Sequence, residues 1–284
     1  MKIKTKTERY SLNLAGAGLA VFPKAEDYNN YGTDLFHEQM NNPSITVMGY
    51  DVFSGKIDEL EISHGKTVIN TINAHSYVVA RSDENFRKAL QSSDVLIADG
   101  FPIVMAAKIL KNSSINKIAG EDMFFYLLEK LNKSGRSCFF LGSTEKTLQK
   151  IEKRLKTDFP DIRAGFFSPP YKEKFSESDN KIMLYEINSF KPDVLFIGMT
   201  APKQEKWVNE NRNNIEASII CSIGAVFDFY ARNIKRPSKF WIKLRLEWLI
   251  RLINEPRRLW KRYLISSPRF LKELLLVKMG IIKR

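Results

Sequence analysis

Between residues 45 and 223, short apolar runs alternate with longer amphipathic segments. The runs predict strands over residues 46–52, 67–73, 95–98, 138–141, 162–167, 194–197 and 218–223. Helical spacing falls between them, over residues 77–90, 124–131, 144–155 and 179–190. Runs that are apolar throughout, such as VLFIG at 194–198, are typical of parallel strands buried on both faces. The pattern predicts an α/β fold, with a Rossmann-like, mostly parallel sheet covered by helices on both faces.

The two ends of the chain differ from this middle part. Residues 1–44 show no clear period and are predicted to be an N-terminal extension to an α/β catalytic domain at residues 45–231. From residue 240 helical spacing returns, and Pro256 and Pro268 divide it into three short predicted helices. We therefore expect a helical C-terminal appendage at residues 232–284. No run reaches the roughly 18 to 20 apolar residues that span a bilayer, so a membrane contact is expected to be peripheral.

The charge of the chain is concentrated in this appendage. Residues 232–284 hold 16 of the 45 Lys and Arg residues and three of the 32 Asp and Glu residues, which accounts for the whole net charge of +13. Three of the four tryptophans lie there as well. A basic segment on a neutral body is expected to meet something anionic: phospholipid, nucleic acid or a phosphorylated substrate. A solvated basic surface that packs on the body is the alternative.

The two cysteines, Cys138 and Cys221, each lie within a predicted buried strand. This placement favours a reducing cytoplasm over a disulfide framework.

Small and polar residues follow several predicted strands, where the ligand crevice of an open parallel sheet lies. Asp99 comes directly after one strand and suits a general base, or the N-cap of a helix that begins near Pro102. Thr71 and Asn73 suit sugar hydroxyls, or turn and capping roles. His75 is expected to be a packed or capping histidine. The further candidates for donor or acceptor binding at strand ends are Gly100, Gly142, Gly198, Pro202, Gln204, Gly224 and Asp228.

Gly142, Ser143 and Thr144 place backbone N–H groups at a predicted helix start, where phosphate binds favourably. The chain has neither a GxGxxG pattern nor a P-loop, which disfavours a nucleotide-dependent oxidoreductase and P-loop hydrolysis. The three histidines have no metal-ligand spacing, so neither a metal nor a cofactor is expected. A diphosphate leaving group then needs fixed cations, which the basic appendage supplies.

Six motifs in order resemble the WecG/TagA/CpsF family of bacterial glycosyltransferases. They are TINAHS at 71–76, ADGFPIV at 98–104, GEDM at 120–123, GMTAPKQEKW at 198–207, GAVFDF at 224–229 and LEWLIRLINEPRRLWKRY at 246–263. The resemblance implies an inverting enzyme that moves an N-acetylmannosamine-type sugar from UDP to GlcNAc on a polyprenyl diphosphate. It also implies a cytoplasmic enzyme, peripheral on the inner face of the plasma membrane, for cell-surface polysaccharide synthesis.

The resemblance assigns roles to individual residues. Asp99 becomes the base, Thr71 assists substrate binding, and Gln204 contacts the donor while it also belongs to the first turn of a helix after Pro202. The basic positions that match the diphosphate-binding residues of the family best are Arg236, Arg251, Arg257 and Arg258. One departure concerns Arg232, where the family usually has Gly.

The expected partners are therefore a UDP-sugar donor, a lipid-linked acceptor and an anionic membrane surface. A homo-oligomer is compatible with the sequence. The alternative function is a basic nucleic-acid-binding α/β protein, because clustered Arg and Lys residues with aromatic neighbours also suit phosphates and bases.

Overall fold

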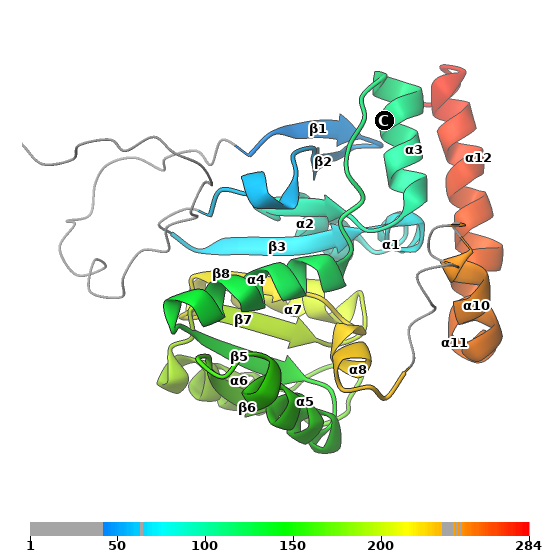
Figure 1. Cartoon of the computed structure of the whole chain (residues 1–284). Coiled ribbons are helices and arrows are strands. Elements are labelled where there is room, and N and C mark those ends of the chain that lie inside the picture. Colours follow the sequence, from blue (N-terminus) through cyan, green and yellow to red (C-terminus); the bar gives the residue numbers. More distant parts are fainter. Residues whose placement is uncertain (1–41, 63–64, 235–240, 242–243, 245, 284) are drawn as a thin grey trace, which may run out of the picture.

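A six-stranded parallel sheet forms the centre of the protein (Figure 1). The computed structural model describes residues 42–62, 65–234, 241, 244 and 246–283. The strand order is β4-β3-β8-β7-β5-β6, and the predicted α/β class with a parallel sheet is confirmed. The strands are β3 Thr67–Ile72, β4 Val95–Ala98, β5 Ser137–Gly142, β6 Arg163–Phe167, β7 Val194–Gly198 and β8 Ile219–Ser222.

Helices cover both faces of this sheet, as predicted. Helices α4 (Gly120–Ser134), α5 (Glu145–Asp158) and α8 (Val226–Tyr230) contribute to one buried cluster, and α6 (Glu177–Phe190) and α7 (Lys203–Asn211) to another. Side chains alternate between the two faces along each strand. In β7, for example, Phe196 packs edge-on against Phe124 of α4 with ring centres 5.0 Å apart, while the next residue along, Ile197, joins the cluster of α6 and α7.

Two predicted elements differ from the structure. Residues 46–52 were predicted as one strand but form an antiparallel hairpin of β1 (Ser44–Val47) and β2 (Tyr50–Phe53). Its turn uses left-handed backbone at Met48 and Gly49 (φ 53° and 84°), which reverses the chain. Residues 77–90 were predicted as one helix but form two, α1 (Ala74–Ala80) and α2 (Glu84–Gln91).

The break between α1 and α2 has a local cause. The backbone of Asp83 is extended, and its carboxylate accepts a hydrogen bond of 2.9 Å from the N–H of Phe86. Asp83 is therefore an N-cap, which starts a new helix inside an otherwise continuous apolar period.

The C-terminal helices pack against α1 and against α3 (Phe101–Lys111). They are α10 (Glu247–Asn254), α11 (Pro256–Trp260), the π-helix η4 (Lys261–Ser266) and α12 (Ser267–Lys278). Pro256 begins α11, as predicted, but Pro268 does not interrupt the helix. It lies in the first turn of α12, directly after the π-helix, where a missing N–H is tolerated. Figure 1 shows α12 alongside α3. None of the described helices is long and apolar enough to cross a membrane.

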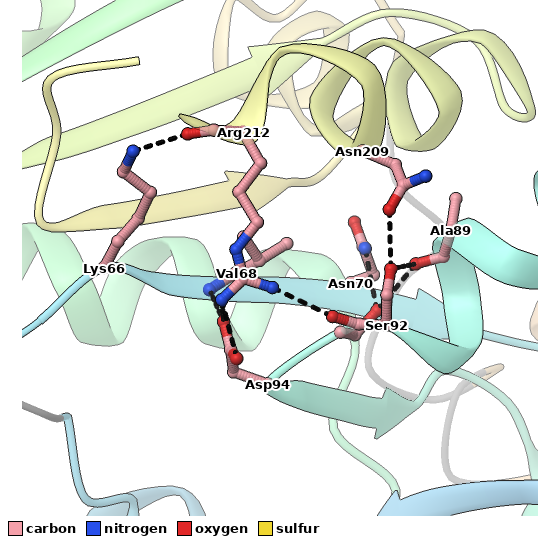
Figure 2. A network of polar contacts seen from close by, with 9 residues as sticks. Lys66, Val68, Asn70, Ala89, Ser92, Asp94, Asn209 and Arg212 are labelled. Carbon is pink, nitrogen blue, oxygen red and sulfur yellow. Dashed lines mark hydrogen bonds and ion pairs between the residues drawn. The ribbon is translucent and has the colours of Figure 1, made fainter. Parts of the chain in front are cut away.

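A polar network ties the amino ends of β3 and β4 to the end of α7 (Figure 2). The Asp94 carboxylate accepts two hydrogen bonds from Arg212 Nη2, at 2.8 and 2.7 Å, and one of 2.7 Å from the N–H of Val68. Lys66 Nζ donates to the carbonyl of Arg212. The network fixes the end of the sheet that is opposite the strand ends where the candidate site lies.

Candidate active site

A cavity of about 270 Å³ lies at the carboxyl ends of four neighbouring strands and is bounded by the C-terminal helices. The strands β4, β3, β8 and β7 are adjacent, so residues that are far apart in the sequence meet there. The predicted site residues that line the cavity are Thr71, Asn73, Asp99, Gly198, Gln204, Gly224, Asp228, Arg251 and Arg258.

Other predicted site residues lie elsewhere. Gly100, Gly142, Pro202 and Arg257 do not line the cavity, and Arg236 lies outside the described residues. The structure gives Gly142 a packing role: a Cβ atom there would lie 2.7 Å from the carbonyl oxygen of Gly198. Gly142 therefore permits the close approach of β5 to β7.

The loop after β5, which was predicted to hold phosphate, uses some of its polar groups in hydrogen bonds within the protein. The N–H of Ser143 donates to the Gly198 carbonyl at 3.1 Å. Thr144 Oγ1 accepts from the N–H of Thr147 at 3.3 Å and thereby caps α5. One of the N–H groups considered for phosphate is thus already paired.

Asp99 lies at the end of β4 and is half-buried on the cavity wall. The capping alternative for it is wrong: the N-cap of α3 is Gly100, and no side chain caps that helix. No hydrogen bond or ion pair joins the Asp99 carboxylate to another described residue. The carboxylate is therefore available to accept a proton from a ligand in the cavity.

Asn73 is the N-cap of α1. Its Oδ1 accepts from the N–H groups of His75 and Ser76 at 3.0 and 3.1 Å, so the capping alternative is correct. Its Nδ2 has no hydrogen-bond partner in the part of the chain that the structure describes and remains able to donate. Thr71, two residues earlier and half-buried, lines the same cavity.

Gln204 and Glu205 lie in the first turn of α7 and are almost fully buried on the cavity wall. Gln204 Nε2 donates to Glu205 Oε1 at 2.9 Å. Burial raises the pKa of Glu205 to about 7, although the hydrogen bond from Gln204 lowers it in part. From the sequence, Glu205 was expected only to be a residue of the first helical turn.

The C-terminal helices contribute three arginines to the cavity: Arg251, Arg258 and Arg262. Arg251 lies over the Phe229 ring, 5.2 Å from its centre, and Arg258 pairs with Glu255 at 2.6 Å. Arg262 was not among the predicted site residues. It belongs to the basic run at 257–262. Arg262 lines the cavity, whereas the predicted Arg257 does not.

His75 also lines the cavity, although the sequence predicted a packed or capping role. Its Nδ1 lies 2.9 Å from Ser266 Oγ in the π-helix. Burial, together with the positive charge of Arg262, lowers the pKa of His75 below its ordinary value. The sequence feature that could have identified His75 as a cavity residue is its position two residues after Asn73 in TINAHS.

This arrangement defines an α/β protein with a cavity at the carboxyl ends of its strands, lined by the Asp99 carboxylate and three arginines. The chain belongs to the Glycosyl transferase WecG/TagA/CpsF family, whose model matches residues 40–283. It is a glycosyltransferase by this membership, and the nucleic-acid-binding alternative receives no support from it.

Three relatives illustrate the similarity. The chain is 30% identical over 203 residues to a protein of Bacillus subtilis, an alignment that covers 72% of this chain and 77% of the relative. It is 28% identical to a protein of Bacillus spizizenii, covering 75% and 84%. It is 26% identical to a protein of Staphylococcus aureus, covering 76% and 82%. All three relatives are named N-acetylglucosaminyldiphosphoundecaprenol N-acetyl-beta-D-mannosaminyltransferase.

Proposed function

We propose that this enzyme transfers an N-acetylmannosamine-type sugar from a UDP donor to GlcNAc on a polyprenyl diphosphate, with inversion at the anomeric carbon. The names of the relatives support both the transferred group and the acceptor. The observation that carries the proposal is a single cavity in which Asp99 shares the walls with Arg251, Arg258 and Arg262.

In the proposed reaction Asp99 removes the proton from the acceptor hydroxyl as its oxygen attacks the anomeric carbon. The new C–O bond forms on the face opposite the bond to UDP, which breaks and releases UDP with the bonding electron pair. One displacement therefore inverts the anomeric centre. A positioned base contributes on the order of 10² to 10⁴ in rate.

The arginines of the C-terminal helices have the complementary role. Guanidinium groups grip two phosphate oxygens at once, and they stabilise the negative charge that develops on the departing diphosphate. In this proposal Arg251, Arg258 and Arg262 provide that charge without a metal ion. Replacement of Arg258 by Lys would keep the charge but lose the paired geometry.

The same helices are proposed to hold the enzyme on the inner face of the plasma membrane. Phe270 and Leu274 of α12 are buried, whereas Leu271, Leu275 and Met279 are exposed on its outer side. Basic residues near an anionic leaflet contribute on the order of 1 kcal/mol each. An exposed apolar face with basic neighbours suits peripheral binding beside a lipid-linked acceptor.

The proposed function is tested by a screen of donors. The purified chain is incubated with UDP-N-acetylmannosamine, other UDP-sugars and a short-chain GlcNAc-diphospholipid, and the lipid is analysed by mass spectrometry. We expect a mass increase of one N-acetylhexosamine from UDP-N-acetylmannosamine, with release of UDP. Asp99→Asn should bind the donor normally and lose most turnover. Near-normal turnover by Asp99→Asn would contradict the assignment of the base.

A further inference from the structure

The pair formed by Gln204 and Glu205 has more hydrogen-bonding capacity than the fold uses. The two side chains are 3% and 2% exposed and are joined by one bond from Gln204 Nε2 to Glu205 Oε1. The other oxygens, Gln204 Oε1 and Glu205 Oε2, have no hydrogen-bond partner among the described residues. Buried polar atoms in folded proteins are normally paired, so two neighbouring unpaired acceptors require an explanation.

The cavity explains where a partner for these oxygens can come from. Both residues line it, and so does Gly224. A Cβ atom at Gly224 would lie 3.7 Å from both terminal atoms of the Gln204 amide, so the glycine keeps a side chain out of the space beside that amide. The two unpaired acceptors thus belong to side chains of the cavity wall.

The fold itself gains little from the Glu205 carboxyl. Burial raises its pKa to about 7, which means that its charged form is disfavoured in the cavity without a ligand. No described Lys or Arg forms an ion pair with it. A buried carboxyl that weakens a fold and faces a cavity is typical of a binding or catalytic group.

The geometry points to Gln204 and Glu205 as a paired acceptor for two hydroxyl groups of a reacting sugar. This inference rests on the proposed function. Hydroxyl groups donate the hydrogen bonds that both free oxygens lack. Phosphate oxygens are acceptors and carry negative charge, so they suit the arginines instead.

Glu205→Met tests the pair, because Met has a similar length and makes no strong hydrogen bond. The affinities of wild type and variant for UDP and for UDP-N-acetylmannosamine are measured by calorimetry, and the KM for the GlcNAc lipid is measured separately. We expect UDP binding to stay unchanged and one sugar substrate to bind about 10- to 100-fold more weakly. Glu210→Met, on the exposed side of α7, is the matched control and should alter none of these values.

The pattern of loss identifies which sugar is bound. Weaker binding of UDP-N-acetylmannosamine places the pair on the transferred sugar, and a raised KM for the lipid alone places it on the acceptor. A loss already present with UDP would overturn the inference, as would unchanged values for all three ligands. Failure of the wild type to bind any UDP-sugar would instead overturn the proposed function, and the inference with it.

Deoxy analogues separate a lost contact from a disturbed fold. Removing the recognised hydroxyl from the sugar should weaken binding to wild type about 10-fold or more and hardly weaken binding to Glu205→Met. If each deoxy analogue weakens binding to both proteins equally, Glu205 does not contact a sugar hydroxyl. Each comparison is between two ligands on the same protein. A change in the stability of the variant therefore cannot produce the expected result.

Discussion

His75 Nδ1 and Ser266 Oγ lie 2.9 Å apart, although 191 positions separate the residues in the chain. The contact joins the start of α1, directly after β3, to the last residue of the π-helix that carries Arg262. A second contact joins α1 to α12, where Tyr77 Oη donates to Glu273 Oε2 at 2.8 Å. These bonds hold the arginine-bearing helices on the mouth of the cavity.

Loss of the His75–Ser266 bond should loosen that arginine wall. We expect Ser266→Ala to lower kcat/KM about 3- to 10-fold, since a hydrogen bond contributes about 0.5–1.5 kcal/mol. Steady-state kinetics with the GlcNAc lipid provides the measurement. Ser134→Ala, which removes a hydroxyl bond within α4 far from the cavity, should leave kcat/KM unchanged. Equal kinetics for wild type and Ser266→Ala would show that the bond does not position the arginines.

The buried carboxyl of Glu205 should make the stability of the protein depend on pH. Its pKa in the folded state, about 7, exceeds its ordinary value of 4.5. Between these values the folded state binds a proton that the unfolded state has released, so this group lowers stability as pH rises. The contribution is on the order of 3 kcal/mol across the window.

Glu205→Met removes that dependence. Between pH 5 and pH 8 the free energy of unfolding of the variant should rise relative to that of wild type. Urea unfolding at the two pH values measures it, and the exposed Glu210→Met is the reference for other titrating groups. A difference that is constant with pH would mean that Glu205 titrates normally in the folded protein.

The exposed side of α12 should bind anionic membranes. Leu275 and Met279 are 58% and 62% exposed, and replacing both by Glu adds repulsion and removes apolar contact. We expect the double variant to lose most sedimentation with phosphatidylserine vesicles, and truncation after Ile234 to abolish it. The control replaces Ile182 and Tyr185, apolar residues of α6 that are 51% and 70% exposed, by Glu. Undiminished sedimentation of the truncated chain would exclude a membrane role for this segment.

Arg232 follows the C-cap residue of α8, Ala231, and adopts a conformation that favours glycine. Its φ is 56°, its N–H donates to the Phe229 carbonyl at 3.0 Å, and the N–H of Asn233 donates to the Asp228 carbonyl at 2.9 Å. This pair of bonds is a Schellman motif, whose left-handed position is usually Gly. The family's usual Gly at this position therefore has a backbone reason.

Arg232→Gly should raise the free energy of unfolding by about 1 kcal/mol, because glycine adopts this conformation without a steric cost. Arg232→Ala keeps the Cβ atom and should not be stabilised in the same way. Thermal or urea unfolding of the three proteins decides the matter. Equal stability of the Gly and Ala variants would show that Arg232 is not strained.

The sequence by itself determined the elements and the chemistry at their ends. Apolar runs of strand length located the sheet strands to within one or two residues, because local periodicity reports which side chains are buried. It likewise placed Asp99 and Gly224 after strands and Thr71 near the end of one. Apolar periodicity did not predict the turn between β1 and β2 or the helix break at Asp83. Left-handed backbone forms the turn, and the Asp83 cap starts a new helix within a continuous apolar pattern.

Only the tertiary structure decided which of these ends meet. The order β4-β3-β8-β7 brings Asp99 next to residues more than 100 positions away, while the β5 end with Gly142 stays outside the cavity. Tertiary structure also brings Arg262 and His75 together at the cavity, because the C-terminal helices pack on α1. Strand order and helix docking arise from burial between distant segments, which the local pattern of polar and apolar residues does not encode.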